Sequence, residues 1–128
     1  MRPMTFVCLC FTALALASTA GCARKQEQVS YQKDVAPILQ AKCAACHVPG
    51  QQGYVASGFD LSGYDSLMKG TKFGAVVIPG DPLTSVLVML IEGRADPSLK
   101  MPHGGAQPLT KDEIKTIRRW VKQGAKNN

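Results

Sequence analysis

The stretch Cys43-Ala44-Ala45-Cys46-His47 decides how the rest of this chain is interpreted. Two residues separate the two cysteines, so a single helical turn presents both thiols on one side, and an imidazole follows at once. The other three of the five cysteines lie within the first 22 residues. Because a disulfide-stapled domain would contain more pairs at wider separations, this pair has another purpose.

The pattern Cys-x-x-Cys-His is the attachment signature of a c-type haem. One helical turn offers both sulfurs to the two vinyl groups on one haem edge, and the next residue can turn its imidazole under the iron. We therefore expect one covalent haem c, attached through Cys43 and Cys46, with His47 as the proximal iron ligand.

Three other uses of the motif remain open at this point. A thioredoxin-like site needs a strand before the cysteines, and no run of β-branched residues precedes Cys43. Structural zinc needs four ligands, and beyond position 22 the chain offers only two cysteines and two histidines, Cys43, Cys46, His47 and His103. A simple disulfide between the two cysteines would leave His47 without a role.

The second axial ligand of the iron is expected from Met101. This residue stands in the irregular stretch Lys100-Met101-Pro102-His103-Gly104-Gly105. Pro102 stiffens the backbone directly after the thioether, and we expect it to line the haem pocket. His103 is the rival ligand and would give a bis-histidine haem of lower potential. An open, high-spin iron is the remaining possibility.

The other two methionines beyond the expected leader suit the distal position less well. Met68 lies in a short segment and could be core packing. Met89 falls in an expected helix, where it points away from the apolar stripe at about 100° per residue. That stripe has the spacing of a core-facing helix surface and consists of Leu83, Val86, Leu87, Leu90 and Ile91.

The first half of the expected domain contains two helices separated by a loop. Asp34 can cap the first helix, with Pro37 in its first turn, where a missing N–H group is tolerated. This helix runs toward Cys43. Residues 48–58 contain a proline and three glycines and are expected to form a loop around the haem edge, and residues 62–69 form a short second helix.

Two more helices follow. Asp81 as N-cap opens the third, which Gly93 closes. Thr110 and Glu113 form a capping-box pair ahead of the last helix, which Gly124 ends. Its apolar stripe is Ile114, Ile117, Trp120 and Val121, and the opposite face carries Lys111, Lys115, Arg118, Arg119 and Lys122. A solvated helix face explains these cations better than a dedicated docking site does.

The beginning of the chain has the layout of an export signal. Residues 1–21 are typical of a signal peptide, and the small residues before Cys22 resemble a bacterial lipobox, although Thr19 stands where an aliphatic residue is usual. We expect a lipid on Cys22, a polar tether over residues 22–29 and the domain over residues 30–126. The protein would then lie in the periplasm or on the outer face of a bacterial membrane. Ordinary signal-peptide cleavage is the alternative and would release it.

The composition is that of a globular chain, with 45% hydrophobic and 19% charged residues. The formal net charge is +6. A nucleic-acid binder would concentrate its cations near aromatic groups, whereas these cations are spread along the chain and aromatic residues make up 6%. We therefore expect no nucleic-acid partner.

The order of these motifs resembles a small monohaem cytochrome c of class I, and in particular the exported, planctomycete-type bacterial cytochrome c domains. Segments that carry the resemblance are Val35-Ala36-Pro37-Ile38-Leu39, Gly58-Phe59-Asp60-Leu61, Pro79-Gly80-Asp81-Pro82, Met101-Pro102, Leu109-Thr110 and Trp120. The resemblance implies an all-α fold with the first and last helices packed together. It also implies thioethers at Cys43 and Cys46, with His47 as proximal and Met101 as distal ligand.

The function expected on these grounds is the transfer of single electrons to and from redox partner proteins, with no enzyme activity. Ligation by histidine and methionine raises the potential because the soft thioether favours Fe(II). The alternative is a gas-binding or sensing haem protein in which Met101 is a labile ligand. A peroxidase ranks third, since it would want distal acid–base groups and His103 is the only histidine available for that role.

Overall fold

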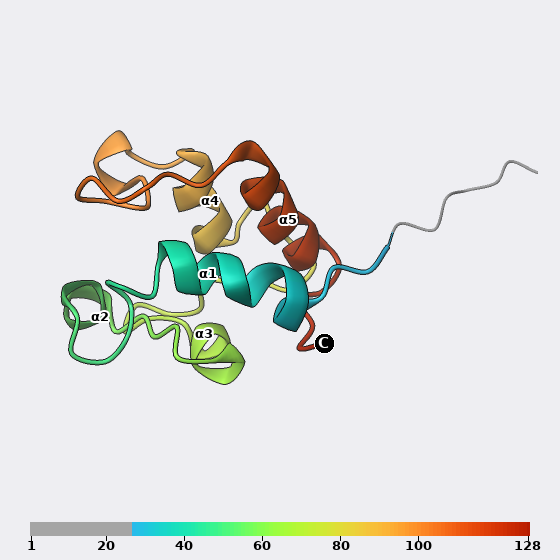
Figure 1. Ribbon diagram of the computed structural model, residues 1–128, viewed down its shortest axis with the longest axis horizontal. Coiled ribbons are helices and arrows are strands. Elements are labelled where there is room, and N and C mark those ends of the chain that lie inside the picture. The colour runs from blue at the N-terminus through green and yellow to red at the C-terminus, as the bar shows by residue number, and fades with distance from the viewer. Residues whose placement is uncertain (1–26) are drawn as a thin grey trace, which may run out of the picture.

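Short helices joined by loops make up residues 27–128, which are the residues that the computed structural model describes (Figure 1). In chain order they are the π-helical turn η1 (Tyr31–Val35), α1 (Ala36–Lys42), α2 (Gln52–Ser57), α3 (Tyr64–Lys69), α4 (Val86–Glu92), the 3₁₀ turn η2 (Pro97–Leu99) and α5 (Lys111–Lys122). Over this range an isolated bridge between Thr71 and Gly74 is the only β-type pairing. The prediction of an all-α domain is therefore confirmed. The predicted signal peptide and Cys22 lie outside the described residues.

The first helix begins earlier than predicted. Ser30, not Asp34, is its N-cap: the Ser30 hydroxyl accepts the backbone N–H of Lys33 at 3.2 Å. Asp34 completes the cap, because its carboxylate accepts the backbone N–H of Ser30 at 2.8 Å. This reciprocal arrangement is a capping box with one extra residue, which the π-helical turn η1 accommodates. η1 then continues directly into α1, with Pro37 in the first turn of α1 as predicted.

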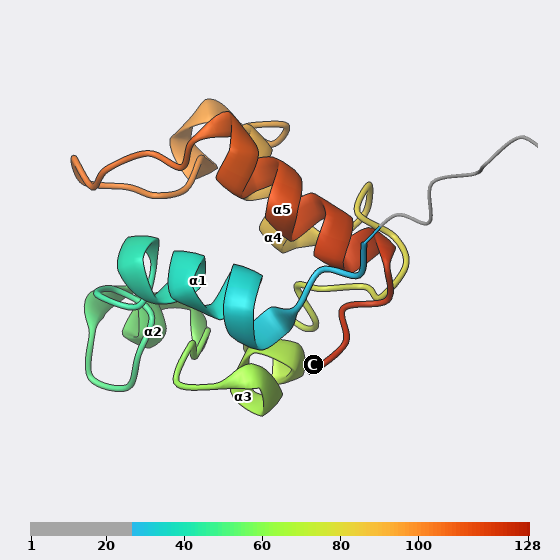
Figure 2. The same cartoon turned by 45° about the vertical axis from the view of Figure 1, so that its right-hand side comes forward.

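The N-terminal helical segment packs against α5 through η1, and Figures 1 and 2 show the two side by side at an angle to each other. The ring of Tyr31 lies 5.6 Å from that of Trp120 and 5.1 Å from that of Tyr64. The polar groups of Tyr64 and Trp120 are both hydrogen-bonded. The Tyr64 hydroxyl donates to the carbonyl of Ala125 at 2.8 Å, and the Trp120 indole N–H donates to the carbonyl of Lys126 at 2.9 Å. This aromatic cluster joins the two ends of the domain.

Helix α5 follows the sequence pattern closely. Its capping box is present: the hydroxyl of Thr110 accepts the backbone N–H of Glu113, and the carboxylate of Glu113 accepts that of Thr110. The predicted stripe faces the core, with Ile117, Trp120 and Val121 fully buried and Ile114 half-buried. The capping residues and the apolar period agree, and therefore fix both the start and the rotation of the helix.

Helix α4 differs from its prediction at its start. Asp81 caps a turn instead, accepting the backbone N–H of Leu83 at 2.9 Å and the hydroxyl of Thr84 at 2.6 Å. The helix begins at Val86 and ends at Gly93, as expected, where φ is +67°. The later start changes the buried stripe, which is Leu87, Val88 and Ile91, whereas Leu83 and Val86 are exposed.

Two further boundaries differ from the sequence predictions. The expected loop over residues 48–58 contains helix α2, which ends at Gly58 with φ of +72°. The folded part also extends beyond residues 30–126, because Val29 is buried in the core and the carbonyl of Asn128 accepts the backbone N–H of Gln32 at 3.0 Å. No helix within residues 27–128 has the length and apolar character that crossing a bilayer requires.

Candidate haem site

The motif cysteines lie in a tight turn directly after α1. The backbone N–H of Cys43 donates to the carbonyl of Leu39 at 2.9 Å, and those of Cys46 and His47 both donate to the carbonyl of Cys43 at 3.1 Å. Both thiols are free and both residues are half-buried. The end of one helix and the turn that follows it thus bring the two sulfurs and the imidazole into one short segment.

Two neighbours pack closely against the imidazole of His47. Gly53 of α2 lies so close that a Cβ atom there would stand 2.7 Å from the carbonyl oxygen of Cys46 and 2.8 Å from Cε1 of His47. The ring of Phe59 meets the imidazole edge-on, with centroids 5.3 Å apart. The backbone N–H of Leu61 donates to the carbonyl of His47 at 2.7 Å. His47 therefore has little freedom to move.

The surroundings of His47 favour its neutral form. Burial lowers the pKa of this imidazole, and His103 acts in the same direction, while the backbone of Phe59 opposes them. Its Nδ1 atom is enclosed and has no hydrogen-bond partner among the described residues. Neutral imidazole is the form that binds metals, so the ring suits the binding of a metal ion.

The thiol of Cys43 is unsuited to thiol–disulfide chemistry. Burial raises its pKa to about 11, with Cys46 and Glu113 adding to the rise and Lys42 opposing it. Reactive cysteines have a lowered pKa, so the shift is in the opposite direction. The described residues contain no strand before the motif, as a thioredoxin-like site requires, and no group of three metal-ligating side chains, as zinc would need.

The segment that contains Met101 lies at the same end of the molecule as the motif. Figures 1 and 2 both show the orange chain before α5 on the side of α2 and the last turn of α1. The ammonium of Lys42 donates to the side chain of Gln107 at 2.7 Å. Met101 is half-buried against the core, and its backbone N–H donates to the carbonyl of Leu90 at 3.2 Å. Pro102 is half-buried as well, whereas His103 is exposed.

The other methionines differ in their surroundings. Met68 is half-buried and packs against the core, as its prediction as a core residue requires, while Met89 is half-buried on α4. Met68 belongs to α3, and Met101 belongs to an irregular segment. An irregular segment can adjust its backbone to place a side chain, and the distal role of Met101 stays a prediction.

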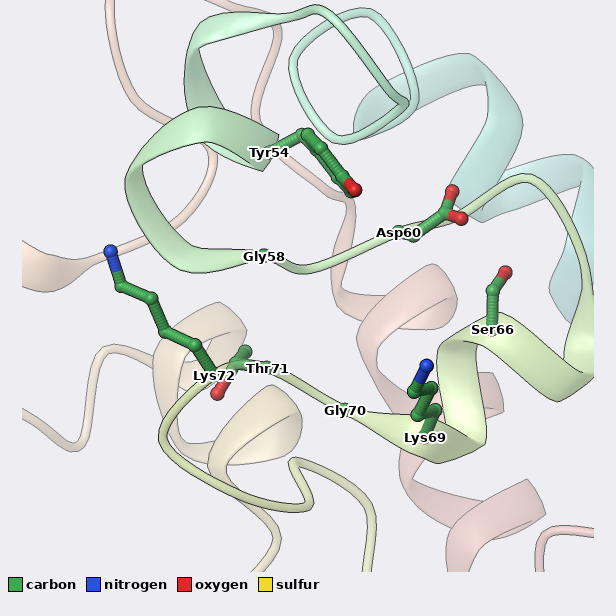
Figure 3. A pocket seen from close by; sticks show the side chains of 8 residues that line it. All are labelled: Tyr54, Gly58, Asp60, Ser66, Lys69, Gly70, Thr71 and Lys72. Carbon is green, nitrogen blue, oxygen red and sulfur yellow. The ribbon is translucent and has the colours of Figure 1, made fainter.

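A separate hollow of about 320 Å³ lies between α2 and α3 and contains none of the predicted site residues. Figure 3 shows the hydroxyl of Tyr54 and the ammonium of Lys69 directed toward its middle, whereas Lys72 points away. The carboxylate of Asp60 on its wall already accepts the hydroxyl of Ser62 at 2.6 Å. Charges of both signs therefore share this hollow.

Sequence reasoning missed two residues that position the imidazole. Gly53 was one of several glycines in an expected loop, and its close approach to His47 leaves no mark in the sequence. Phe59 belongs to a segment that was singled out, Gly58-Phe59-Asp60-Leu61, but only as part of a resemblance. Its place beside the motif could have been suspected from that resemblance alone.

The residues present fit a c-type haem. Two free, half-buried thiols are available for covalent attachment, and burial favours the neutral form of the His47 imidazole beside them, which is the form that binds metals. The half-buried Met101 adds a soft sulfur donor at the same end of the domain. Imidazole and thioether are a donor pair known for haem iron.

Comparison with known proteins identifies a relative that is part of a larger protein. The chain is 28% identical over 127 residues to the alpha subunit of hydrazine synthase from Kuenenia stuttgartiensis, covering 79% of this chain. The solved structure of Kuenenia stuttgartiensis hydrazine synthase matches with a TM-score of 0.55 at 27% identity, again over 79% of this chain. The chain spans only 16% of the length of that relative.

This similarity contradicts the expectation that the chain is not an enzyme, because the relative is a subunit of an enzyme. The expectation rested on the absence of a catalytic residue pattern within this domain alone. A haem domain can form part of a larger catalytic protein, which its own side chains do not reveal.

Residues 43–104 match the family described as Planctomycete cytochrome C. The match begins at the first motif cysteine and ends just after the segment that contains Met101 and His103. Cytochrome c domains bind haem c covalently, and domains of this type are typically exported. The chain therefore contains a cytochrome c domain of the planctomycete type.

Proposed function

We propose that this domain carries single electrons through one haem c, attached at Cys43 and Cys46 and ligated by His47 and Met101. The observation that carries the proposal is the motif turn, in which two free thiols stand beside an imidazole held by Gly53 and Phe59.

Each side chain has a distinct role in this proposal. The thiols hold the haem permanently, and His47 supplies one nitrogen from a position that neighbouring backbone groups fix. Met101 supplies a soft sulfur, with Pro102 restricting the backbone beside it. The haem supplies a one-electron couple, and histidine–methionine ligation raises its potential.

The proposed setting is the outside of the cytoplasmic membrane, with the chain anchored by a lipid on Cys22. Two or more acyl chains suffice for stable anchoring, whereas one gives only marginal binding. The proposed partner is an enzyme or another redox protein that exchanges electrons with the haem. An enzyme partner is favoured because the similar segment in the relative belongs to an enzyme subunit.

Covalent attachment is tested by extraction. Denatured wild-type protein treated with acidified acetone should retain its haem, and its mass should exceed that of the bare chain by one haem. The Cys43→Ala, Cys46→Ala double variant should lose it. Haem that is extracted from the wild-type protein would refute c-type attachment.

The distal ligand is tested by the sulfur-to-iron charge-transfer band of the oxidised protein. Met101→Leu should abolish this band and lower the midpoint potential. Met68→Leu and Met89→Leu are matched controls that should retain it, and His103→Ala should change little. Loss of the band in a control but not in Met101→Leu would assign the ligand elsewhere.

The gas-binding alternative makes a different prediction for the same protein. If Met101 is labile, carbon monoxide should bind the reduced wild-type protein readily and displace the thioether from the iron. Electron carriage with a stable ligand predicts slow or no binding in the wild-type protein and rapid binding in Met101→Leu.

The lipid anchor is tested by mass and by partition into detergent. Acylated protein should enter the detergent phase, and Cys22→Ser should be soluble or remain unprocessed. Equal solubility of the wild-type protein and Cys22→Ser would favour ordinary secretion.

A further inference from the structure

The outward face of α5 forms a cationic groove, a hollow of about 180 Å³ lined by Lys115, Arg118, Arg119 and Lys122. These positions are three and four residues apart, so they form one stripe along the helix. The buried stripe of Ile117, Trp120 and Val121 lies toward the core. The cations thus share one surface that the fold leaves accessible.

The charge of this groove is largely uncompensated. Arg118 pairs with Glu92 at 2.9 Å, and no other ion pair joins a groove residue to an acid within residues 27–128. Lys115 with Arg119, and Arg118 with Lys122, are like-charge pairs at i, i+4, which destabilise a helix. A solvated helix face would reduce this repulsion by interleaving acids, but the acids of α5 occupy only its first turn.

Arg119 provides a second, independent observation. Its Nε atom is enclosed and finds no hydrogen-bond acceptor among the described residues. A buried donor without a partner is unfavourable, and the guanidinium group matches the oxygens of a phosphate group well. The groove therefore offers a guanidinium group that suits an anion with several acceptor oxygens.

The N-terminal segment enters the described domain beside this groove. The side chain of Gln123, the residue after Lys122, accepts the backbone N–H of Val29 at 2.7 Å and donates to the carbonyl of Glu27 at 3.1 Å. Cys22 lies five residues before Glu27, a span of at most about 18 Å at full extension. A lipid on Cys22 would keep this end of α5 close to the bilayer surface.

We propose that the cationic groove docks on the phosphate-bearing headgroups of an anionic membrane. This inference rests on the proposed anchor only for its location, because the charge and the unpartnered Nε belong to α5 itself. Basic residues near an anionic surface contribute to binding in proportion to their number. The lipid would hold the protein at the membrane, and the groove would set which face turns toward it.

The test measures vesicle binding by the soluble, processed form of the holo-protein carrying Cys22→Ser, which removes any contribution from an acyl chain or from the leader. Phosphatidylglycerol-containing vesicles are compared with pure phosphatidylcholine vesicles at low and at high salt. We expect clear preference for the anionic vesicles, and loss of that preference as salt rises. No preference at low salt would overturn the proposal and leave an acidic protein surface as the alternative occupant.

Matched variants separate the groove from net charge. Lys115→Gln, Arg119→Gln and Lys122→Gln together should weaken binding to anionic vesicles by about 100-fold, since each basic residue contributes about fivefold. Lys33→Gln, Lys69→Gln and Lys72→Gln remove the same charge elsewhere and should weaken it only a few-fold. Equal losses in the two triple variants would refute a specific groove. The acylation mass of the wild-type protein reports on the anchor separately, so either idea can fail alone.

Discussion

The two segments that supply the proposed haem ligands are held in very different ways. Around His47, backbone hydrogen bonds of 2.7 to 3.1 Å fix the carbonyls of Cys43, Cys46 and His47, and Gly53 packs against the ring. The segment from Met101 to Leu109 has one backbone hydrogen bond to the rest of the fold, at 3.2 Å, and residues 103–108 are exposed.

This difference teaches where the domain can vary without losing its cofactor. Attachment and the proximal ligand depend on close packing that admits few substitutions. The distal ligand depends on a segment with few restraints, in which local opening costs little. We therefore expect changes near the motif to affect assembly of the protein, and changes in the distal segment to affect mainly its potential.

The largest effect is expected from Gly53→Ala. The added Cβ would stand 2.7 Å from the carbonyl oxygen of Cys46 and 2.8 Å from the imidazole of His47, so one of them must move. The yield of protein with covalent haem should fall severalfold, as measured by the ratio of haem absorbance to protein. Gly63→Ala is the matched control, because a Cβ there meets nothing within 4 Å; an equal loss in both would show that the crowding at His47 is unimportant.

Phe59→Ala should follow in size. Phe59 is 7% exposed and lies edge-on to His47, and truncating such a side chain costs about 3 kcal/mol of unfolding free energy. Phe73, which is 81% exposed, is the control: Phe73→Ala should have little effect in the same denaturant titration. If Phe59→Ala lowers the free energy of unfolding by less than Thr110→Ala or Gln107→Ala does, the contrast between the two segments is wrong.

Thr110→Ala is expected to lower the free energy of unfolding by about 1 kcal/mol, because it removes the N-cap of α5, where the distal segment joins the helix.

The pKa of Glu113 is lowered mainly by the hydrogen bond from the Thr110 backbone. A lowered folded-state pKa means that this contribution is present above 4.5, its ordinary value, and is lost as the pH falls through the folded-state pKa. Thermal unfolding from pH 7 down to acid should show that Glu113→Gln loses less stability on acidification than the wild-type protein does.

The smallest effect is expected from Gln107→Ala. Its hydrogen bond to Lys42 is exposed, and such contacts contribute little to stability, so the free energy of unfolding should change by less than about 0.5 kcal/mol. The midpoint potential is the more informative measurement, because this contact links the distal segment to α1. A loss of stability as large as that of Phe59→Ala would mean that the distal segment is as firmly held as the motif.

Sequence patterns predicted best where several local signals agreed. At α5 the capping pair Thr110 and Glu113 and the apolar period pointed to the same helix, and the structure confirms it. At α4 the Asp81-Pro82 pattern correctly indicated a cap but not the start of the helix, since Asp81 caps a separate turn and the helix starts at Val86. One pattern can serve two structures, and only tertiary packing decides between them.

The site shows the same limit. The motif predicts the attachment segment because the chemical groups that it needs lie in consecutive residues. The support that Gly53 and Phe59 give to His47 depends on chain segments meeting in space. Ligation by Met101 is of this second kind and stays a prediction, based on a proline-stiffened irregular segment.

The two ends of the described chain meet at one place on the surface. The hydroxyl of Ser30 donates to the carbonyl of Asn128 at 2.7 Å, and the amide of Asn128 donates to the carbonyl of Val29 at 3.3 Å. The chain at Val29 and the chain at Asn128 therefore lie side by side. Domains whose two ends lie close together tolerate insertion into longer proteins, so a host protein could acquire such a domain as one continuous segment without a change in its own fold.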